Sequence, residues 1–282
     1  MEFLEDLKTF WQALMKSFEK IKISKINYGR HSFEPSDVMK RSSYDGCFNV
    51  CSKCLYVFYN KSSLELHMDR CEALKNEIFK IFYTQTFPNE EKHKTIGFSK
   101  VNRIKNKQTL TALGESFISL KTNYFNVNEY DIYIAIDLES KDILGYFSKN
   151  TFNDNSLSCL VVFPPYKNTG IAKLLIDLSQ QPVISSIKND VEITNTTLYT
   201  PLGPERPLSA EASRCFRKYW AYKVNGYKTV KEAVENENLN EEDAIIGFEV
   251  NGYDFKQNEF IDKTYKIKRP RRILDRKLIK KK

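Results

Sequence analysis

Four potential metal ligands between residues 51 and 71 constrain the fold of this chain more than any other feature of its sequence. They form the pattern Cys51-x2-Cys54-x12-His67-x3-Cys71, a spacing typical of a tetrahedral zinc site. The two-residue gap allows one turn to present both thiolates, and His67 and Cys71 are predicted to face the same way from one helical turn. Since protein ligands fill all four positions, we expect the zinc to be structural.

The alternative is a set of ordinary buried cysteines with a surface histidine, which requires four residues to fall at ligand spacing by accident. Cys47 is a fifth candidate nearby, and we interpret it as an idle thiol. A zinc finger also permits nucleic-acid binding, but the predicted helix SSLELHMDRC has few basic residues for a major groove. The chain starts with the acidic, amphipathic stretch MEFLEDLKTFWQ, so we expect an intracellular protein whose six cysteines serve metal binding or catalysis.

The formal net charge of +8 is concentrated at one end of the sequence. Residues 266–282 contain ten Lys or Arg and a single acidic residue, Asp275, so the remainder is close to neutral. Such a tail is typical of a nuclear-localisation signal or a nucleic-acid contact; the alternative is a solvated tail without a partner. No stretch approaches the roughly 18 apolar residues of a membrane span, so no membrane partner is expected.

The hydrophobic pattern predicts a mixed α/β fold. Residues 1 to about 20 are predicted to form an amphipathic helix, and EIFKIFY a strand. From 96 to 163 the segments FISL, EYDIYIAIDL, DILGYFSK and SLSCLVVF predict a long antiparallel meander. Helices are predicted in IAKLLIDLSQ, over Leu208 to Tyr222 with Ser209 as its N-cap, and in two short segments before a turn at Asn251-Gly252.

Two further segments have candidate chemistry. Between Ser158 and Lys173 a strand passes through a turn into a helix, and the small residues Gly170 and Ala172 allow backbone amides to approach a pyrophosphate at the helix N-terminus. The turn is neither a Walker A loop nor a GxGxxG motif. Glu205 lies between two prolines before a helix start, where a solvated loop residue is the ordinary interpretation.

These segments resemble the MYST family of histone acetyltransferases. SLSCLVVFPPYKNTGIAKLLIDLS is similar to the acetyl-CoA-binding segment of that family, and GPERPLS followed by FRKYW resembles its catalytic-glutamate segment. The zinc finger of three cysteines and one histidine, ISLKTNYFNV and ILGYFSK match in the same order, over roughly residues 25 to 260. Within the family, the chain most resembles the short fungal SAS-type members.

The resemblance implies an acetyl-CoA-dependent N-acyltransferase core with an antiparallel sheet. It implies that Glu205 is the general base, Cys159 the cysteine beside the acetyl group and Lys121 an autoacetylated lysine. A lysine amine with a pKa near 10.4 must lose a proton before it attacks a thioester, and a carboxylate can accept it. Direct attack in a ternary complex is favoured over an acetyl-Cys159 intermediate. The implied acetyl-CoA-binding residues are Leu160, Val161, Val162, Lys167, Asn168, Thr169, Gly170, Ile171, Ala172, Lys173 and Ser209.

The expected domains are an N-terminal helix (1–24), a zinc-finger lobe (25–95), an acetyltransferase core (96–222), a helical C-terminal lobe (223–262) and a basic tail (263–282). The chain departs from the family at Lys167-Asn168, where Gln-Arg is usual, at Ala172, and in a longer connection over 181–202. By resemblance we expect a nuclear enzyme that acetylates histone tails, with histone H4 favoured, together with accessory subunits. The alternatives are a catalytically weak chromatin-binding subunit, a zinc-finger nucleic-acid-binding protein and a small-molecule acetyltransferase.

Overall fold

The chain forms two compact units in a computed structural model. The structure describes residues 22–35, 39–40, 46–88, 94–117, 124–153, 155–181, 184, 203–255 and 259–260. One unit contains residues 1–80, 101–128 and 140–143, and the other contains 81–100, 129–139 and 144–282. The predicted N-terminal helix up to residue 21, Lys121, most of the 181–202 connection and the basic tail lie outside the described residues. Among the described residues, no helix has the length and apolar character to span a membrane.

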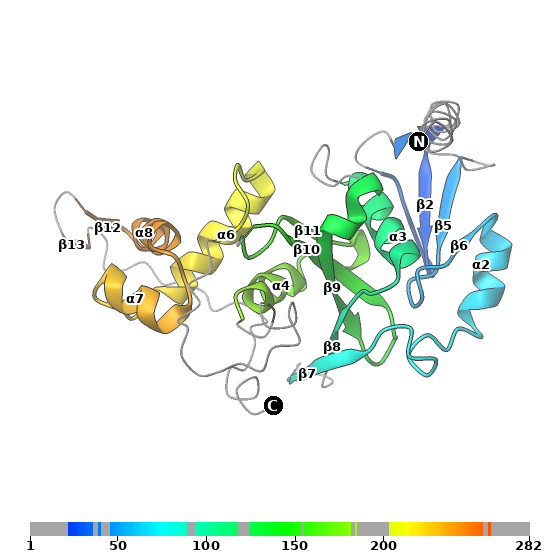
Figure 1. Cartoon of the computed structure of the whole chain (residues 1–282), viewed down its shortest axis with the longest axis horizontal. Helices are drawn as coiled ribbons and strands as arrows, with labels where there is room; N and C mark the ends of the chain where they lie inside the picture. The colour runs from blue at the N-terminus through cyan, green and yellow to red at the C-terminus, as the bar shows by residue number, and fades with distance from the viewer. Residues whose placement is uncertain are drawn as a thin grey trace, which may run out of the picture. The chain divides into compact units, whose positions relative to one another are not determined.

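The first unit is built around a four-stranded sheet and a short helix. The sheet has the order β3-β2-β5-β6, with β2 and β5 parallel, and helix α2 lies beside β6 (Figure 1). Asn60 caps α2 by accepting a hydrogen bond from the Ser63 amide, and Leu64 and Met68 are buried on one face because they lie four residues apart. The elements are β1 (Lys22–Ile23), β2 (Lys25–Tyr28), β3 (His31–Phe33), β4 (Met39–Lys40), β5 (Cys47–Val50), β6 (Val57–Phe58) and α2 (Lys61–Met68).

Helix α3, Ile104–Glu115, also belongs to the first unit and corrects the prediction of uninterrupted strands from residue 96. Its sequence, IKNKQTLTALGE, buries Leu110 and Leu113, three residues apart, so helical packing outweighs the β-branched Thr residues. Within FISL, which was predicted to be a strand, Phe117 lies in a turn, and its ring centroid is 5.7 Å from that of Phe33. The rest of FISL lies outside the described residues.

The second unit contains a five-stranded sheet with the order β11-β10-β9-β8-β7. Each strand therefore neighbours the one before it in sequence, and the pairs β7–β8, β8–β9 and β10–β11 are antiparallel. The predicted antiparallel pairing is confirmed for β10 with β11, whereas β8 was not among the predicted strands. Strands β9 and β10 are buried on both faces, which explains their continuous apolar sequences. The strands are β7 (Ile81–Phe87), β8 (Lys94–Lys100), β9 (Tyr130–Asp137), β10 (Ile143–Asn150) and the edge strand β11 (Cys159–Val162); 3-10 turns occupy Tyr124–Glu129 and Pro164–Tyr166.

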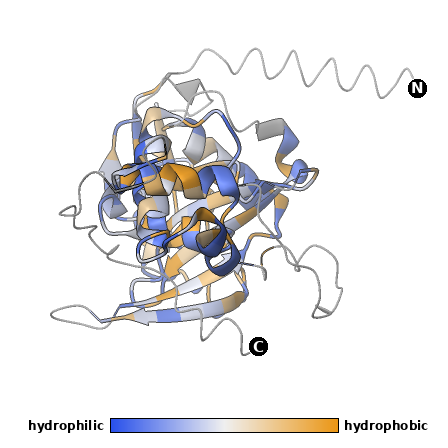
Figure 2. Ribbon diagram, turned by 90° about the vertical axis from the view of Figure 1, so that its left-hand side faces the viewer, coloured by the Kyte–Doolittle hydropathy of each residue, from blue (hydrophilic) through white to orange (hydrophobic). Residues whose placement is uncertain are grey.

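Four helices among the described residues pack with this sheet in the second unit, and the mixed α/β fold is confirmed. Helix α4 packs on β11 and on α6, while α6 and α7 pack on α8 (Figure 1). Apolar side chains of these helices and of the sheet form one core, visible as the hydrophobic segments in Figure 2. The predicted helices and the turn after Val250 are confirmed. The elements are α4 (Ile171–Ser179), α6 (Ala210–Lys223), α7 (Val230–Glu237), α8 (Glu241–Val250), β12 (Tyr253–Asp254) and β13 (Glu259–Phe260).

A buried ionic network fixes α4 against α6 and α7. Asp177 is fully buried on α4, where it accepts a 2.6 Å hydrogen bond from the Tyr219 hydroxyl. The Lys223 ammonium lies 3.6 Å from Asp177 and 2.5 Å from Glu237. Because buried charges are tolerated only when they are paired, this network determines how the three helices meet.

Candidate functional site

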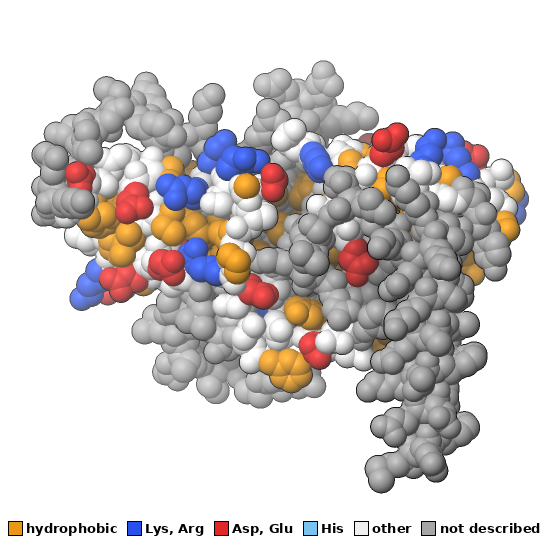
Figure 3. Space-filling model, turned by 90° about the horizontal axis from the view of Figure 1, so that it is seen from above, with side chains coloured by type: hydrophobic (Ala, Val, Ile, Leu, Met, Phe, Trp, Pro, Cys, Tyr) orange, Lys and Arg blue, Asp and Glu red, His pale blue; other side chains and the backbone are white. Residues whose placement is uncertain are grey.

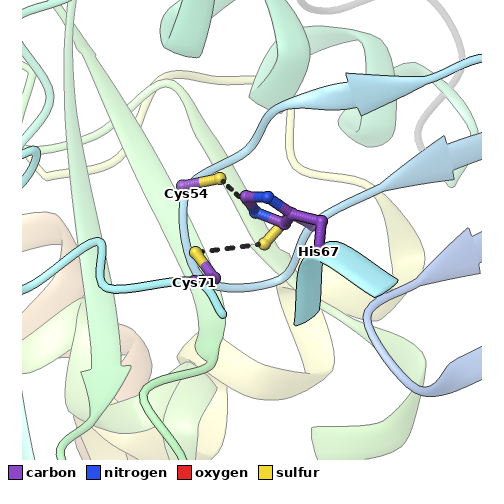
Figure 4. Close-up of side chains that lie close together, drawn as sticks. Cys54, His67 and Cys71 are labelled. Carbon is purple, nitrogen blue, oxygen red and sulfur yellow. Dashed lines mark hydrogen bonds between the residues drawn. The ribbon is translucent and has the colours of Figure 1, made fainter. Parts of the chain in front are cut away.

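The predicted metal ligands converge in the first unit. The Sγ atoms of Cys51, Cys54 and Cys71 and a ring nitrogen of His67 all lie within 4.8 Å of one another. Cys51 Sγ is 3.7 Å from Cys71 Sγ, and Cys54 Sγ is 3.3 Å from His67 Nε2 (Figure 4). Zinc–sulfur bonds of ~2.3 Å in a tetrahedron place two sulfurs about 3.8 Å apart. The donor set and its spacing therefore fit a zinc ion.

The first ligand turn is shaped to present sulfur to a cation. The Lys53 amide donates to Cys51 Sγ at 3.4 Å, and Leu55 adopts a left-handed backbone with φ 64° to close the turn. A hydrogen bond with Cys54, followed by burial, raises the pKa of the Cys51 thiol, and burial raises the pKa of Cys71. Three thiols packed this closely with an imidazole are stable as thiolates only with a cation between them, and a bound metal deprotonates such thiols.

One detail of the predicted finger is wrong. Helix α2 ends at Met68, so His67 occupies its last turn while Cys71 follows three residues after the helix. The chain turns there, since the Arg70 amide donates to the His67 carbonyl at 3.0 Å, and this turn brings Cys71 back to the other ligands. Cys47 begins β5 and is not a member of the ligand group found among the described residues.

In the second unit, main-chain pairing brings the Glu205 segment to the start of β11. Leu157 and Pro204 form a parallel bridge. The Glu205 amide donates to the Leu157 carbonyl at 2.8 Å, and the Ser156 amide donates to the Gly203 carbonyl at 2.7 Å. Glu205 is half-buried. The structure thus places the Glu205 main chain beside Leu157, which is distant in sequence and lies two residues before Cys159.

Cys159 and Glu205 share a neighbour, Tyr130, which the sequence analysis missed. Cys159 is 3 % exposed. Burial raises the pKa of Tyr130, and the nearby Glu205 and Cys159 raise it further. The phenol is therefore within electrostatic range of both predicted catalytic side chains. Tyr130 begins β9, and no spacing in the sequence distinguishes it from the other tyrosines.

The predicted acetyl-CoA-binding segment is an edge strand followed by a left-handed turn. β11 pairs only with β10 in this sheet, so its outer backbone edge faces no strand among the described residues. Asn168 and Gly170 have φ of 61° and 91°, and Gly170 is the N-cap of α4 without a side-chain cap. As in any helix, the first-turn amides of α4 have no intrahelical partners, and they lie at the positive end of the helix dipole. This arrangement suits a phosphate-bearing ligand.

Two other predicted contacts lie at helix N-termini. Lys173 is half-buried in the first turn of α4, and burial lowers the pKa of its amine. Ser209 caps α6 as predicted, with its hydroxyl accepting a 3.2 Å hydrogen bond from the Ala212 amide. Leu160 and Val162 are half-buried on β11, and Val161 is buried. Lys121 lies outside the described residues.

Surface charge on the face seen in Figure 3 is mixed. Lys and Arg side chains are interspersed with Asp, Glu and hydrophobic side chains over its described part. On α2 itself, Lys61 is paired with Glu65 at 3.3 Å. DNA-binding surfaces present basic side chains along a groove or strip, and the described residues of this face do not.

Comparison with known proteins gives one consistent result. Residues 91–251 match the model of the MOZ/SAS family. The chain is 27% identical over 188 residues to the histone acetyltransferase Tip60 homolog of Caenorhabditis elegans, covering 63% of this chain and 36% of that protein. It is 25% identical over 231 residues to histone acetyltransferase esa-1 of Neurospora crassa (77% and 42%) and 27% identical over 180 residues to SAS2 of Saccharomyces cerevisiae (61% and 46%). The chain thus spans less than half the length of these relatives.

Proposed function

Because the chain belongs to the MOZ/SAS family of MYST acetyltransferases, we propose that it transfers an acetyl group from acetyl-CoA to a lysine ε-amine of a histone. The observation that supports this proposal is the main-chain pairing of Glu205 with Leu157, which brings the Glu205 segment to the residues just before Cys159. The Glu205 segment would supply a proton acceptor, and the turn that follows β11 would supply an anion-binding helix N-terminus.

In this proposal Glu205 is the general base. A lysine ε-amine is protonated at neutral pH because its pKa is near 10.4, so the incoming amine must lose a proton to become a nucleophile. Glu205 is half-buried and held by its own main chain at Leu157, which keeps the carboxylate near the reacting thioester. Base catalysis of this kind contributes roughly 10²- to 10⁴-fold to turnover.

Acetyl-CoA would bind along the outer edge of β11 and at the turn that follows. Unpaired backbone groups of Leu160 to Val162 would meet the pantetheine arm, and the amides from Lys167 to Lys173 would meet the pyrophosphate. The half-buried Lys173 and the exposed Lys167 add positive charge there. Ser209, at the N-terminus of α6, is the remaining proposed contact. Acetyl-CoA supplies the activated acyl group, and the protein supplies orientation and proton transfer.

Cys159 would lie beside the acetyl group. We propose direct attack of the amine on acetyl-CoA rather than an acetyl-Cys159 intermediate. The structural zinc would be held by Cys51, Cys54, His67 and Cys71, because their donor atoms all lie within 4.8 Å of one another. Lys121 is proposed as the autoacetylated residue on the family resemblance alone.

A histone tail is the proposed substrate, with histone H4 favoured, and the proposed location is the nucleus. The support is that the relatives similar to this chain are histone acetyltransferases. The basic residues between 266 and 282 are proposed as a further contact to nucleic acid. Accessory subunits of a chromatin-acetylating complex are proposed as partners.

The test is incorporation of labelled acetyl groups from acetyl-CoA into core histones, nucleosomes and a small amine such as spermidine. The zinc-loaded chain is expected to label a histone lysine and to leave the small amine unlabelled. Labelling of spermidine alone would make the protein a small-molecule acetyltransferase. No labelling by a folded, zinc-loaded chain, with or without co-purified partners, would favour a non-catalytic chromatin subunit.

A further inference from the structure

Arg206, which follows the proposed base Glu205, holds the Glu205 segment in place at a second point. Arg206 directs one guanidinium nitrogen at Asp243, 2.8 Å from Oδ1, and at Glu242, 3.4 Å from Oε1. The same guanidinium lies over the Trp220 ring, 5.6 Å from its centroid. Both acidic residues are in the first turn of α8 and Trp220 is in α6. Arg206 therefore ties the Glu205 segment to two helices of the C-terminal part.

The two carboxylates that contact Arg206 differ in burial. The Asp243 side chain is 1 % exposed, whereas that of Glu242 is 67 % exposed. An ion pair in solvent is screened and contributes little, while a buried pair is costly to break because it leaves an uncompensated charge. Asp243 is thus the partner that fixes Arg206, and Glu242 is an auxiliary contact at the surface.

Gly203, two residues before Glu205 in the sequence, also brings this segment close to α8. Its backbone has a φ of 77°, and a Cβ atom there would lie 2.5 Å from both Asp243 Oδ2 and Asn240 Nδ2. Such a close approach admits only glycine. Asp243 Oδ2 has no hydrogen-bond partner among the described residues, so the carboxylate is oriented by Arg206 through its other oxygen.

Asp243 itself is held rigidly. Asn240 is the N-cap of α8, and its side chain accepts a 2.7 Å hydrogen bond from the Asp243 amide. A carboxylate in the first turn of a helix is also favoured by the helix dipole. The segment from Gly203 to Arg206 is therefore held on one side by main-chain bonds to Ser156 and Leu157, and on the other by Asp243.

We propose that Asp243 is a positioning residue for Glu205, acting through Arg206 to hold the Glu205 carboxylate at the start of β11. This inference rests on the proposed role of Glu205 and extends the site to a helix that contacts no proposed substrate. Displacing a catalytic group by about 1 Å can cost roughly 10²-fold in rate. Loss of the Asp243 carboxylate should accordingly reduce turnover while substrate and cofactor affinity remain.

The experiment compares Asp243→Asn, Arg206→Met and their double variant with wild type at pH 8. Each single variant is expected to lower kcat by roughly tenfold or more, with the KM for acetyl-CoA within about twofold. The kcat of the double variant should be no lower than that of the more impaired single variant, because both substitutions act through one contact. Asp243→Glu, which keeps the carboxylate, should have a kcat between that of Asp243→Asn and that of wild type. Glu249→Gln, an exposed carboxylate on the same helix, is the matched control and should behave as wild type.

Hydrogen exchange supplies a readout that does not depend on activity. In Asp243→Asn, peptides containing the Ser156 and Glu205 amides should exchange faster, while β9 peptides around Ile134 should be unchanged. A merely structural role would instead lower the melting temperature and speed exchange throughout the second unit. If Asp243→Asn does not fold, Arg206→Met at its more exposed position gives the same readouts.

Three results would overturn the positioning role: wild-type kcat in folded Asp243→Asn, additive losses in the double variant, or unchanged exchange at Ser156 and Glu205. Failure of the proposed function is distinguishable from these. It would appear as absent acetyl transfer by wild type, and the exchange experiment would then still test the anchor.

Discussion

The main-chain amide of Glu205 donates a 2.8 Å hydrogen bond to the carbonyl of Leu157, two residues before Cys159. This single bond joins the segment that precedes α6 to the residues that lead into the edge strand β11. In the zinc-finger unit the four predicted metal ligands come together in one group. In the sheet unit, main-chain pairing joins Leu157 and Pro204, which are distant in sequence.

Replacing a zinc ligand should remove the metal. Cys54→Ser is expected to weaken zinc affinity by more than the roughly 10- to 100-fold that loss of an outer-shell partner costs, and to lower the melting temperature, because metal binding and folding are coupled in such sites. Metal content and thermal unfolding measure both effects. Cys47→Ser is the matched control, and an equal loss of zinc in that variant would contradict the assigned ligand set.

Gly170→Ala should weaken acetyl-CoA binding. The left-handed backbone at φ 91° costs an alanine about 1 to 2 kcal/mol, so the turn before α4 must either strain or rearrange. Gly226→Ala provides a control, since Gly226 has φ 95° with no atom within 4 Å of the added Cβ. Titration of acetyl-CoA should show weaker binding for the first variant and wild-type affinity for the second. Equal acetyl-CoA affinities in Gly170→Ala and Gly226→Ala would contradict the proposal that this turn belongs to the binding site.

Cys159→Ala separates the two chemical routes. Direct attack on acetyl-CoA predicts that the variant keeps more than about a tenth of wild-type turnover, a loss below ~1.4 kcal/mol. Turnover of histone substrate under saturating acetyl-CoA is the measurement. Abolished turnover, together with an acetylated wild-type Cys159 in the intact-mass spectrum, would establish the covalent route instead.

The buried carboxyl of Asp243 should make stability depend on pH. Burial raises the pKa of Asp243 to about 7 from an ordinary 3.8, although Arg206 lowers it. Between these values the native state binds a proton that the unfolded state has released, so the free energy of unfolding falls as the pH rises from about 4 to about 7.

Asp243→Asn lacks this contribution. The difference in free energy of unfolding between wild type and variant should therefore decrease through that pH window and level off above it. Urea unfolding at several pH values between 4.5 and 8.5 tests the prediction, with Glu249→Gln as control. Parallel pH profiles for wild type and Asp243→Asn would contradict it.

Features set by short stretches of sequence were predictable. The ligand spacing from Cys51 to Cys71 defined the finger, and the apolar periodicity after Gly170 and the cap at Ser209 defined α4 and α6. Helix α3 was missed because its buried Leu110 and Leu113 lie among polar and β-branched residues that give no clear helical stripe.

The surroundings of Glu205 were not predictable from local patterns. Its bond to Leu157, the nearby Tyr130 and the Arg206–Asp243 pair all join residues distant in sequence. No periodicity distinguishes Tyr130 from other tyrosines, and Asp243 reads as an ordinary acidic residue in a first helical turn. Only the tertiary packing of α8 shows that it is buried.

The most direct test of the central claim is the rate of acetyl transfer to histone by Glu205→Gln compared with wild type and Glu211→Gln. Glu211 is a matched control because its side chain is 79 % exposed and pairs only with Arg214 among the described residues. Loss of the base predicts a rate lower by roughly 10²- to 10⁴-fold, with unchanged acetyl-CoA affinity and unchanged stability, while Glu211→Gln keeps the wild-type rate. A Glu205→Gln protein that transfers acetyl groups at the wild-type rate would contradict the assignment of Glu205 as the general base.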